Sequence, residues 1–270
     1  MDIYEELYPR IIVFRDAIKD IEKFSDMLKD GSEFVKPWTD WYALGKETNF
    51  KSYPSIKTEK FPSQEEWDST YGALQNIPAK QSLDIFYNCT KIYVEKYNIE
   101  MPNWLHPAPY ILAHLAKNND EILTMNYHTD FVMTKTHNPG FKFWITGLLY
   151  VNDDYEGGEI AFKIFKNKEE VIDDDDYEYF SYKPKSGDFL VIPSHHPYYH
   201  GVKKTTIGTK LFIRMFWGYD YAGSEEWLAN EKKYGKEIWE KMEGDRIKSE
   251  TGRWFKGAVE ETGSSVKVVI

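Results

Sequence analysis

The sequence contains one cysteine, Cys89, among its 270 residues, and it also lacks several features that mark particular protein classes. A single cysteine excludes an internal disulfide and a zinc site built from cysteines, which fits a reducing compartment. No segment approaches the run of about 18 apolar residues that a membrane-spanning helix needs. A basic stretch followed by an apolar one, the mark of a secretory signal, is missing from the first residues. We therefore expect a cytoplasmic protein with no membrane partner.

Basic residues are scarce relative to acidic ones. The chain has 34 Lys and Arg against 44 Asp and Glu, a formal net charge of −10. Such a chain repels phosphate backbones, and no cluster of Lys and Arg interrupts the acidic balance, so nucleic acid is a poor match as a partner. The acidic run from Asp173 to Asp176 is interpreted as a solvated loop tip, with a calcium site as the alternative.

Large apolar residues are plentiful, and they are enough for one packed core. Hydrophobic residues make up 41% of the chain and aromatic residues 17%. We expect a single domain over residues 1–270, because mixed and all-β domains of this length are common. Its parts would be a helical N-terminal support at about 1–120, a β core at about 121–220, and a C-terminal helix and tail at about 224–270.

Hydrophobic spacing predicts the individual elements. Apolar residues recur at helical intervals in 13–28, 82–97 and 225–242, whereas 33–80 is broken by prolines. From residue 122 onward, β-branched and aromatic segments alternate with turn signals. The predicted strands are 122–134, 142–152, 158–166, 178–183, 187–193 and 208–219. So many short strands in sequence indicate a β-sandwich or barrel.

The segment Tyr127-His128-Thr129-Asp130 carries a pattern that suits a metal. On an extended strand His128 and Asp130 point to the same side, and a histidine from a distant strand could complete one face of an octahedral ion. Two histidines and one carboxylate leave positions open, an arrangement suited to Fe(II). A His-x-Asp pair alone is weak evidence, and a hydrogen-bonded pair at the surface is the alternative.

Three histidines compete for the third ligand position. His195 and His196 flank Pro197 in a predicted loop, whereas His200 is followed by Gly201-Val202 and a new strand. We favour His200 as the distant ligand, with the other two as surface or substrate-side residues.

The last predicted strand alternates cations and aromatic residues on one face. Lys210 and Arg214 share that face with Phe212 and Phe216. A cation inside a barrel needs a carboxylate partner, and a dicarboxylate co-substrate would provide one. The alternative is a solvated face carrying Lys210, with the opposite face of the strand as the core.

The order of these motifs resembles the Fe(II)/2-oxoglutarate-dependent dioxygenases, in particular their prolyl 4-hydroxylase-like branch. The resemblance covers about 122–217. Its motifs here are His128-x-Asp130, Thr146-Gly147-Leu148-Leu149-Tyr150-Val151-Asn152, Glu156-Gly157-Gly158-Glu159, Pro184-x-x-Gly187-Asp188, His200-Gly201-Val202 and Gly208-Thr209-Lys210. The resemblance implies a mainly β fold with flanking helices, in which the core is a double-stranded β-helix, or jelly roll.

The same resemblance implies the site. His128, Asp130 and His200 would hold Fe(II). Lys210, ten residues after His200, would bind the far carboxylate of 2-oxoglutarate together with Tyr150, and Arg214 on the same face is the alternative anchor.

The implied reaction is a hydroxylation that uses dioxygen and 2-oxoglutarate and releases succinate and carbon dioxide. The substrate would be a protein or peptide side chain of the prolyl type, or a small amino-acid-type metabolite. Trp38, Trp41, Tyr198 and Tyr199 are candidates to frame its entrance. The alternative function is a jelly-roll module that binds a metal or ligand without catalysis. The sequence indicates no oligomeric state.

Overall fold

Antiparallel strands dominate the described part of the chain. The computed structural model describes residues 4–29, 56–71, 77–100, 104–105, 110–116, 122–130, 141–166, 177–195, 197–220 and 224–243. Strands in the first half are β1 (Glu5–Tyr8), β2 (Ile11–Phe14), β3 (Lys57–Thr58), β4 (Trp104–Leu105), β5 (Tyr110–Leu115) and β6 (Leu123–His128). Those in the second half are β7 (Phe141–Tyr150), β8 (Glu156–Gly157), β9 (Ile160–Phe165), β10 (Tyr177–Tyr182), β11 (Phe189–Pro193), β12 (Tyr198–Lys203), β13 (Thr205–Ile207) and β14 (Thr209–Asp220). The helices are α1 (Ile21–Lys29), α3 (Gln64–Tyr71), α4 (Ile77–Lys96) and α5 (Glu225–Tyr234).

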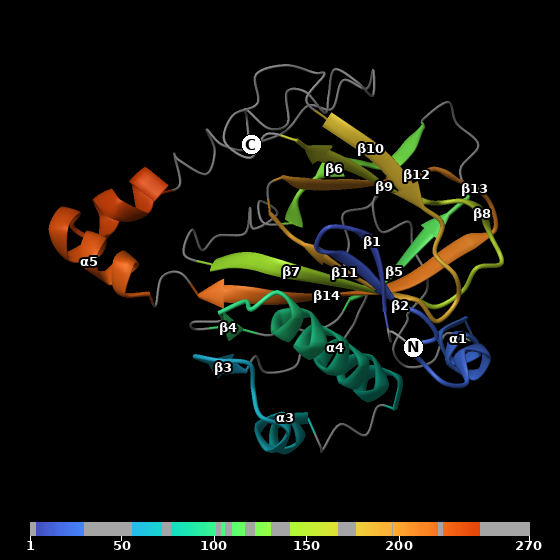
Figure 1. Ribbon diagram of the computed structural model, residues 1–270, viewed down its shortest axis with the longest axis horizontal. Coiled ribbons are helices and arrows are strands. Elements are labelled where there is room, and N and C mark those ends of the chain that lie inside the picture. The colour runs from blue at the N-terminus through green and yellow to red at the C-terminus, as the bar shows by residue number, and fades with distance from the viewer. Residues whose placement is uncertain are drawn as a thin grey trace.

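Two antiparallel sheets lie face to face (Figure 1). Within the described residues, the larger sheet has the order β1-β2-β11-β7-β14-β4-β3, with β5 also paired to β14. The smaller sheet has the order β10-β9-β12-β6. Side chains from the facing surfaces form a shared core, which includes Leu148, Tyr150, Phe162 and Phe212. The expected fold class, mainly β with flanking helices around a jelly-roll core, is confirmed.

Helix α4 covers the outer face of the larger sheet (Figure 1). Leu83, Phe86 and Tyr93 on this helix belong to the second core, together with alternate residues of β7 and β14. The helix can approach closely because Gly147 on β7 has no side chain. A Cβ atom at Gly147 would lie 2.6 Å from Phe189 and 2.9 Å from Phe86. Strands β7 and β14 are therefore buried on both faces, as central strands of a layered fold should be.

The predicted helix at 13–28 was wrong in its first half. Residues Ile11–Phe14 form strand β2, which is fully buried between β1 and β11, and the helix begins only at Ile21. Asp16 and Asp20 take positive φ angles of 50° and 56° between the two elements, which a helix does not allow. A β-branched run therefore outweighed apolar spacing that happened to match a helical period.

Three further features differ from the expectation. Strand β6 ends at His128, so Asp130 lies in a turn beyond it and not on the strand. His200, predicted to lie in a loop before the next strand, is within β12, which was not predicted. The C-terminal helix is interrupted where Gly235, with φ of 84°, caps α5, and helix resumes at 236–243.

None of the described helices is long and apolar enough to cross a membrane.

Candidate metal centre

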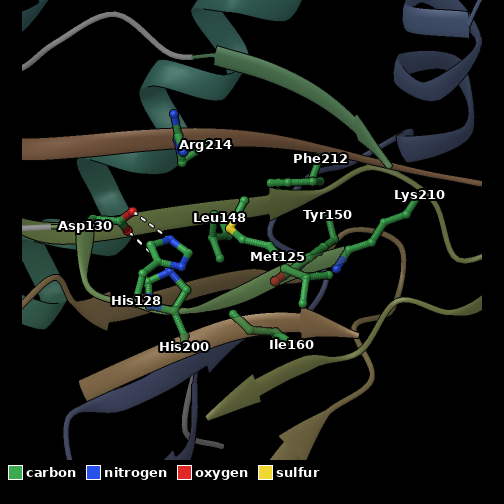
Figure 2. Close-up of a pocket in the computed structure, with 11 residues that line it drawn as sticks. Met125, His128, Asp130, Leu148, Tyr150, Ile160, His200, Lys210, Phe212 and Arg214 are labelled. Atoms are coloured by element: carbon green, nitrogen blue, oxygen red, sulfur yellow. Dashed lines mark ion pairs between the residues drawn. The ribbon is translucent and has the colours of Figure 1, made fainter. Parts of the chain in front are cut away.

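The three residues of the predicted triad come together from two paired strands and an adjoining turn (Figure 2). His128 is the last residue of β6, and His200 is its direct partner on β12. Their imidazole ring centroids are 4.5 Å apart. The turn after β6 brings the Asp130 carboxylate to both rings, and all three side chains are buried. Strand pairing thus brings together histidines that are far apart in sequence.

The distances between the candidate ligand atoms suit one small metal ion. Asp130 Oδ1 lies 3.5 Å from His128 Nε2, and Asp130 Oδ2 lies 3.5 Å from His200 Nε2. One ligand atom from each of the three residues lies within 4.8 Å of the other two. Neighbouring ligands of an octahedral ion with bonds of about 2.1 Å are about 3 Å apart. Small side-chain rotations would therefore close the group around an ion.

The surroundings of both histidines suit metal ligands. His128 Nδ1 lies 2.8 Å from the backbone oxygen of Asn126, which can only accept a hydrogen bond. Nδ1 therefore donates this hydrogen bond, and Nε2, the nitrogen nearest Asp130, is the one that could bind a metal. Burial lowers the pKa of His200 to about 3, although the charge of Asp130 opposes this shift. His200 is therefore neutral at physiological pH.

Asp130 is held as an anion, and only one of its two carboxylate oxygens accepts a hydrogen bond from the described residues. Burial raises the pKa of this carboxyl, but His200, His128 and Arg214 together outweigh burial and hold the pKa well below its usual range. Thr146 on β7 donates a hydrogen bond of 2.6 Å to Oδ2, and Ser194 lies 2.6 Å from the same hydroxyl. Oδ1 is buried and accepts no hydrogen bond from any described residue. A buried anionic oxygen without a donor fits a metal ligand.

A pocket extends from the triad between the two sheets (Figure 2). It encloses about 340 Å³, the open mouth included. The lining of its middle part is apolar: Met125, Leu148, Ile160, Val202 and Phe212. Lys210 and Tyr150 lie at the end away from the triad. A pocket with a metal site at one end and a cation at the other suits a short, linear dianion.

Lys210 is almost completely buried, with 1% of its surface exposed. Its ammonium donates a hydrogen bond of 2.6 Å to the backbone oxygen of Gly158 and lies 5.0 Å from the centre of the Tyr150 ring. No carboxylate of the described residues forms an ion pair with it. Burial, with a smaller contribution from the charge of Lys183, lowers the pKa of Lys210 to about 7, and Glu159 opposes the shift. A buried cation without an anionic partner costs stability, which is the usual mark of a binding site.

A second lysine holds the turn that contacts Lys210. The ammonium of Lys183 donates hydrogen bonds to the backbone oxygens of Tyr155, at 3.1 Å, and Gly157. Gly157 and Gly158 both have positive φ angles, and a Cβ atom at Gly158 would lie 3.2 Å from the Lys210 side chain. The glycine pair therefore allows the backbone oxygen of Gly158 to reach the Lys210 ammonium.

Arg214 lines the same pocket, but at the triad end. Its β14 position is paired with Leu148, whereas Phe212 is paired with Tyr150. The guanidinium lies 4.8 Å from the centre of the Phe216 ring, on the side away from Lys210. The Cα atoms of Lys210 and Arg214 are four strand residues apart, about 13 Å. The predicted alternation on β14 is correct, and its second face, with Leu211 and Trp217, is buried under the helices.

Three further candidates that the structure describes, His195, Tyr198 and Tyr199, do not line this pocket. His195 is half-buried and packs edge-on against Tyr198. Tyr198 belongs to the core between the sheets, and Tyr199 packs against Phe165 on the other face of β12. Trp38, Trp41, His196 and the run Asp173–Asp176 lie outside the described residues.

Sequence reasoning did not find the residues that support the triad. Thr146, within β7, donates to Asp130, and Ser194, just after β11, contacts the Thr146 hydroxyl. The available signal was a polar residue, Thr146, inside an otherwise apolar buried strand, because such a residue needs a polar partner.

Comparison with known proteins gives one match to a family and several to solved structures. Residues 116–218 match the family model of the 2OG-Fe(II) oxygenase superfamily. A prolyl-4-hydroxylase from Pseudomonas putida is 9% identical, with 78% of this chain and 92% of that chain covered and a TM-score of 0.44. A viral collagen prolyl hydroxylase from Paramecium Bursaria Chlorella virus-1, in complex with 2OG, is 11% identical over 78% and 96%, with a TM-score of 0.42. The α-ketoglutarate-dependent epimerase SnoN from nogalamycin biosynthesis is 11% identical over 81% and 83%, with a TM-score of 0.47. No curated protein matches the chain.

Proposed function

We propose that this protein is an enzyme that hydroxylates its substrate and releases succinate and carbon dioxide. The proposal starts from the match of residues 116–218 to the 2OG-Fe(II) oxygenase superfamily. Oxygenases of this superfamily use Fe(II), 2-oxoglutarate and dioxygen. The substrate in this proposal is a protein side chain of the prolyl type or a small amino-acid-type metabolite. The observation that carries the proposal is the convergence of three buried ligand atoms beside a pocket with a cation at its far end.

His128, Asp130 and His200 are the proposed iron ligands. Two imidazoles and one carboxylate match the donor set of non-haem Fe(II) oxygenases, and they would occupy one face of the ion. Thr146 hydrogen-bonds to Asp130, and the backbone oxygen of Asn126 contacts His128. Such contacts to the ligands fix their orientation and so affect metal affinity.

Lys210 and Tyr150 are the proposed anchors of the distal carboxylate of 2-oxoglutarate. The carboxylate would give the buried Lys210 ammonium the anionic partner that the described residues do not supply. Leu148, Ile160 and Phe212 would pack against the two methylene groups. Lys210 is favoured over Arg214 because Arg214 lies at the triad end, where the 2-oxo acid group must chelate the metal.

When bound, Fe(II) supplies the redox chemistry that couples decarboxylation of 2-oxoglutarate by dioxygen to oxidation of the substrate. The chain's own residues bind and orient. Lys210 and the triad fix the two ends of the co-substrate, and the apolar walls between them exclude water. In this proposal the substrate approaches at the triad end, because the metal is held there.

The first test is spectroscopic and needs no substrate. Purified protein, Fe(II) and 2-oxoglutarate are mixed without oxygen, and we expect the weak visible charge-transfer band of the chelate. Asp130→Ala should abolish or greatly weaken the band, and Asp84→Ala, at a half-exposed carboxylate on α4, is the control that should leave it. A wild-type protein without the band at saturating concentrations would instead favour a non-catalytic jelly-roll module.

The second test addresses the reaction. Candidate peptides and metabolites are incubated with Fe(II), 2-oxoglutarate and oxygen, and products are examined by mass spectrometry. A gain of sixteen daltons that depends on Asp130 supports hydroxylation. A different mass change coupled to succinate release would keep the oxygenase and reject the hydroxylase.

A further inference from the structure

Two buried hydroxyl groups and a carboxylate form a continuous chain of hydrogen bonds beside the triad. The Thr146 hydroxyl on β7 lies 2.6 Å from Asp130 Oδ2, and the Ser194 hydroxyl lies 2.6 Å from the same Thr146 oxygen. Thr146 and Ser194 are fully buried, and Asp130 has 1% of its surface exposed. Ser194 does not line the pocket, so any effect that it has on Asp130 must pass through Thr146.

The hydrogen bonds of this chain run in one direction. Thr146 donates its only hydroxyl proton to Asp130 Oδ2. The contact between the two hydroxyl groups therefore has Ser194 as the donor and Thr146 as the acceptor. Hydrogen bonds linked in one direction polarise one another, so the Ser194 proton strengthens the bond that Thr146 donates to Asp130.

Ser194 also belongs to the segment of chain that leads to His200. It follows β11 directly, and the same segment continues into β12, which carries the histidine. The connection between the two strands is a tight turn, in which Tyr198 N donates to the backbone oxygen of His195 at 3.0 Å. Asp130 Oδ2, at the end of the hydroxyl chain, lies 3.5 Å from His200 Nε2. The chain thus joins the start of the segment that carries His200 to the carboxylate that His200 faces.

We propose that Ser194 is a positioning residue of the metal site, which acts on Asp130 through the Thr146 hydroxyl. This role rests on the proposed function, in which Asp130 is an iron ligand. Without the Ser194 hydroxyl, the Thr146 hydroxyl loses the bond that fixes its second side and can rotate away from Oδ2. Asp130 is then held less firmly, and metal affinity falls. A serine that only filled space would have no such effect on Asp130.

A double-mutant cycle tests whether Ser194 acts through Thr146. Mn(II) affinity is measured by calorimetry for the wild type, Ser194→Ala, Thr146→Val and the double variant. In the wild-type background, Ser194→Ala should weaken Mn(II) binding about 3- to 10-fold, the usual net worth of a hydrogen bond between uncharged groups. In the Thr146→Val background no hydroxyl receives the Ser194 proton, so the same change should alter affinity by less than about twofold. Equal losses in the two backgrounds would overturn the proposal and assign the effect to packing.

Co(II) provides a readout that a general loss of stability would not change. The visible absorption of bound Co(II) depends on the kind and geometry of its ligands, and at saturation it does not depend on affinity. Ser194→Ala should shift the Co(II) bands of the saturated protein in the same direction as Thr146→Val does. A Ser194→Ala spectrum identical to that of the wild type would mean that Asp130 has kept its position, and would reject the role of Ser194.

Ser25→Ala is the matched control. Ser25 on α1 is also buried, and its hydroxyl has no hydrogen-bond partner among the described residues, so its replacement should change neither readout. If Ser194→Ala does not fold, Ser194→Cys takes its place, because a thiol fills a similar space and is a weaker donor. It should weaken Mn(II) binding by a smaller factor, again only when Thr146 is present.

Failure of this proposal can be distinguished from failure of the proposed function. A wild type that binds Mn(II) and gives the charge-transfer band with Fe(II) and 2-oxoglutarate, but whose cycle is additive, would reject the role of Ser194 alone. A wild type that binds neither the metal nor 2-oxoglutarate would reject both.

Discussion

His128 and His200 are direct partners across the β6–β12 ladder, and Gly201, next to His200, allows the two strands to pack this closely. A Cβ atom at Gly201 would lie 2.7 Å from the backbone oxygen of Met125 on β6. Backbone cannot move aside as the end of a flexible side chain can. The spacing of the two imidazoles therefore depends on a neighbouring residue that has no side chain.

We predict that Gly201→Ala weakens divalent metal binding at least tenfold. The added methyl would push β12 from β6, separate the imidazoles and cost about 1–3 kcal/mol of unfolding free energy. Mn(II) titration and urea denaturation measure the two effects. Gly235→Ala is the control: its φ of 84° makes an alanine costly, but nothing lies within 4 Å of the added Cβ, so stability should fall while metal affinity is kept. Equal metal binding in both variants would contradict the role of Gly201.

Thr146→Val should weaken metal binding about 10- to 100-fold, the usual cost of losing a group that orients a ligand. The valine has nearly the same shape but cannot donate to Asp130 Oδ2. Thr146→Ser, which keeps the hydroxyl, should bind nearly as the wild type does. Calorimetry with Mn(II) gives both values. If the serine variant loses as much affinity as the valine variant, packing and not the hydrogen bond is responsible.

Lys210→Met should stabilise the free protein and impair it as an enzyme. Removing a buried cation that has no anionic partner among the described residues should raise the unfolding free energy by about 1–3 kcal/mol. The same change should weaken 2-oxoglutarate at least 100-fold, because the distal carboxylate loses its partner. Thermal unfolding and calorimetry measure the two effects. A variant that binds 2-oxoglutarate normally would contradict the proposed pose.

The affinity for 2-oxoglutarate should fall as pH rises above about 7, the value to which burial lowers the pKa of Lys210. Below that pH the lysine is already charged and binding needs no proton. Above it, the free protein must take up a proton to bind the carboxylate, so the dissociation constant should rise by up to tenfold per pH unit. Calorimetry in buffers of different ionisation enthalpy measures how many protons the protein takes up when 2-oxoglutarate binds. Binding with no proton uptake at pH 8 would contradict this prediction.

The ionisation of Lys210 also affects the stability of the protein without 2-oxoglutarate. The pKa of Lys210 is about 7 in the folded state, whereas the ordinary pKa of a lysine is 10.5. Between these values the unfolded chain binds a proton that the folded chain does not, so this residue makes stability rise with pH. The stability advantage of Lys210→Met should therefore shrink from pH 7 to pH 10.

Lys183→Met should shift the pH above which 2-oxoglutarate affinity falls to a higher value. Lys183 lowers the pKa of Lys210 through charge repulsion, so its removal should raise that pKa. Lys185→Met, at an exposed position two residues away, is the matched control and should have no such effect. If Lys183→Met lowers affinity at every pH without moving the midpoint, its hydrogen bonds to the Gly157 turn matter more than its charge.

The sequence allowed the fold class and most core strands to be predicted, because local patterns report them. The alternation of Lys210 and Phe212 with apolar neighbours identified β14 and its two faces. Strand β2 was mistaken for helix because its apolar residues also match helical spacing. Strand β12 was missed because it follows a proline and two loop-like histidines. That the whole chain forms one domain stays a prediction.

The candidate site could be predicted only in part. The spacing of His128 and Asp130 is local and visible in the sequence. The residues following His200 favoured it over His195 and His196, strand alternation singled out Lys210 and Arg214, and the resemblance to a known family gave these residues their roles. The partners of Asp130 on other strands depend on register, which no local pattern specifies. The position of Arg214 at the triad end likewise follows from the pairing of β14 with β7. These long-range relationships separate the two cations that the sequence could not distinguish.

Cys89 has a practical consequence for following this protein in solution. Its thiol is buried on α4, and burial raises its pKa to about 12, so almost no thiolate is present at neutral pH. It is also the only cysteine in the chain. A cysteine introduced on an exposed face, for example at Lys232 on α5, would react alone with a fluorescent or spin label. Distances from that label to a paramagnetic ion at the triad could then be measured without first removing any native residue.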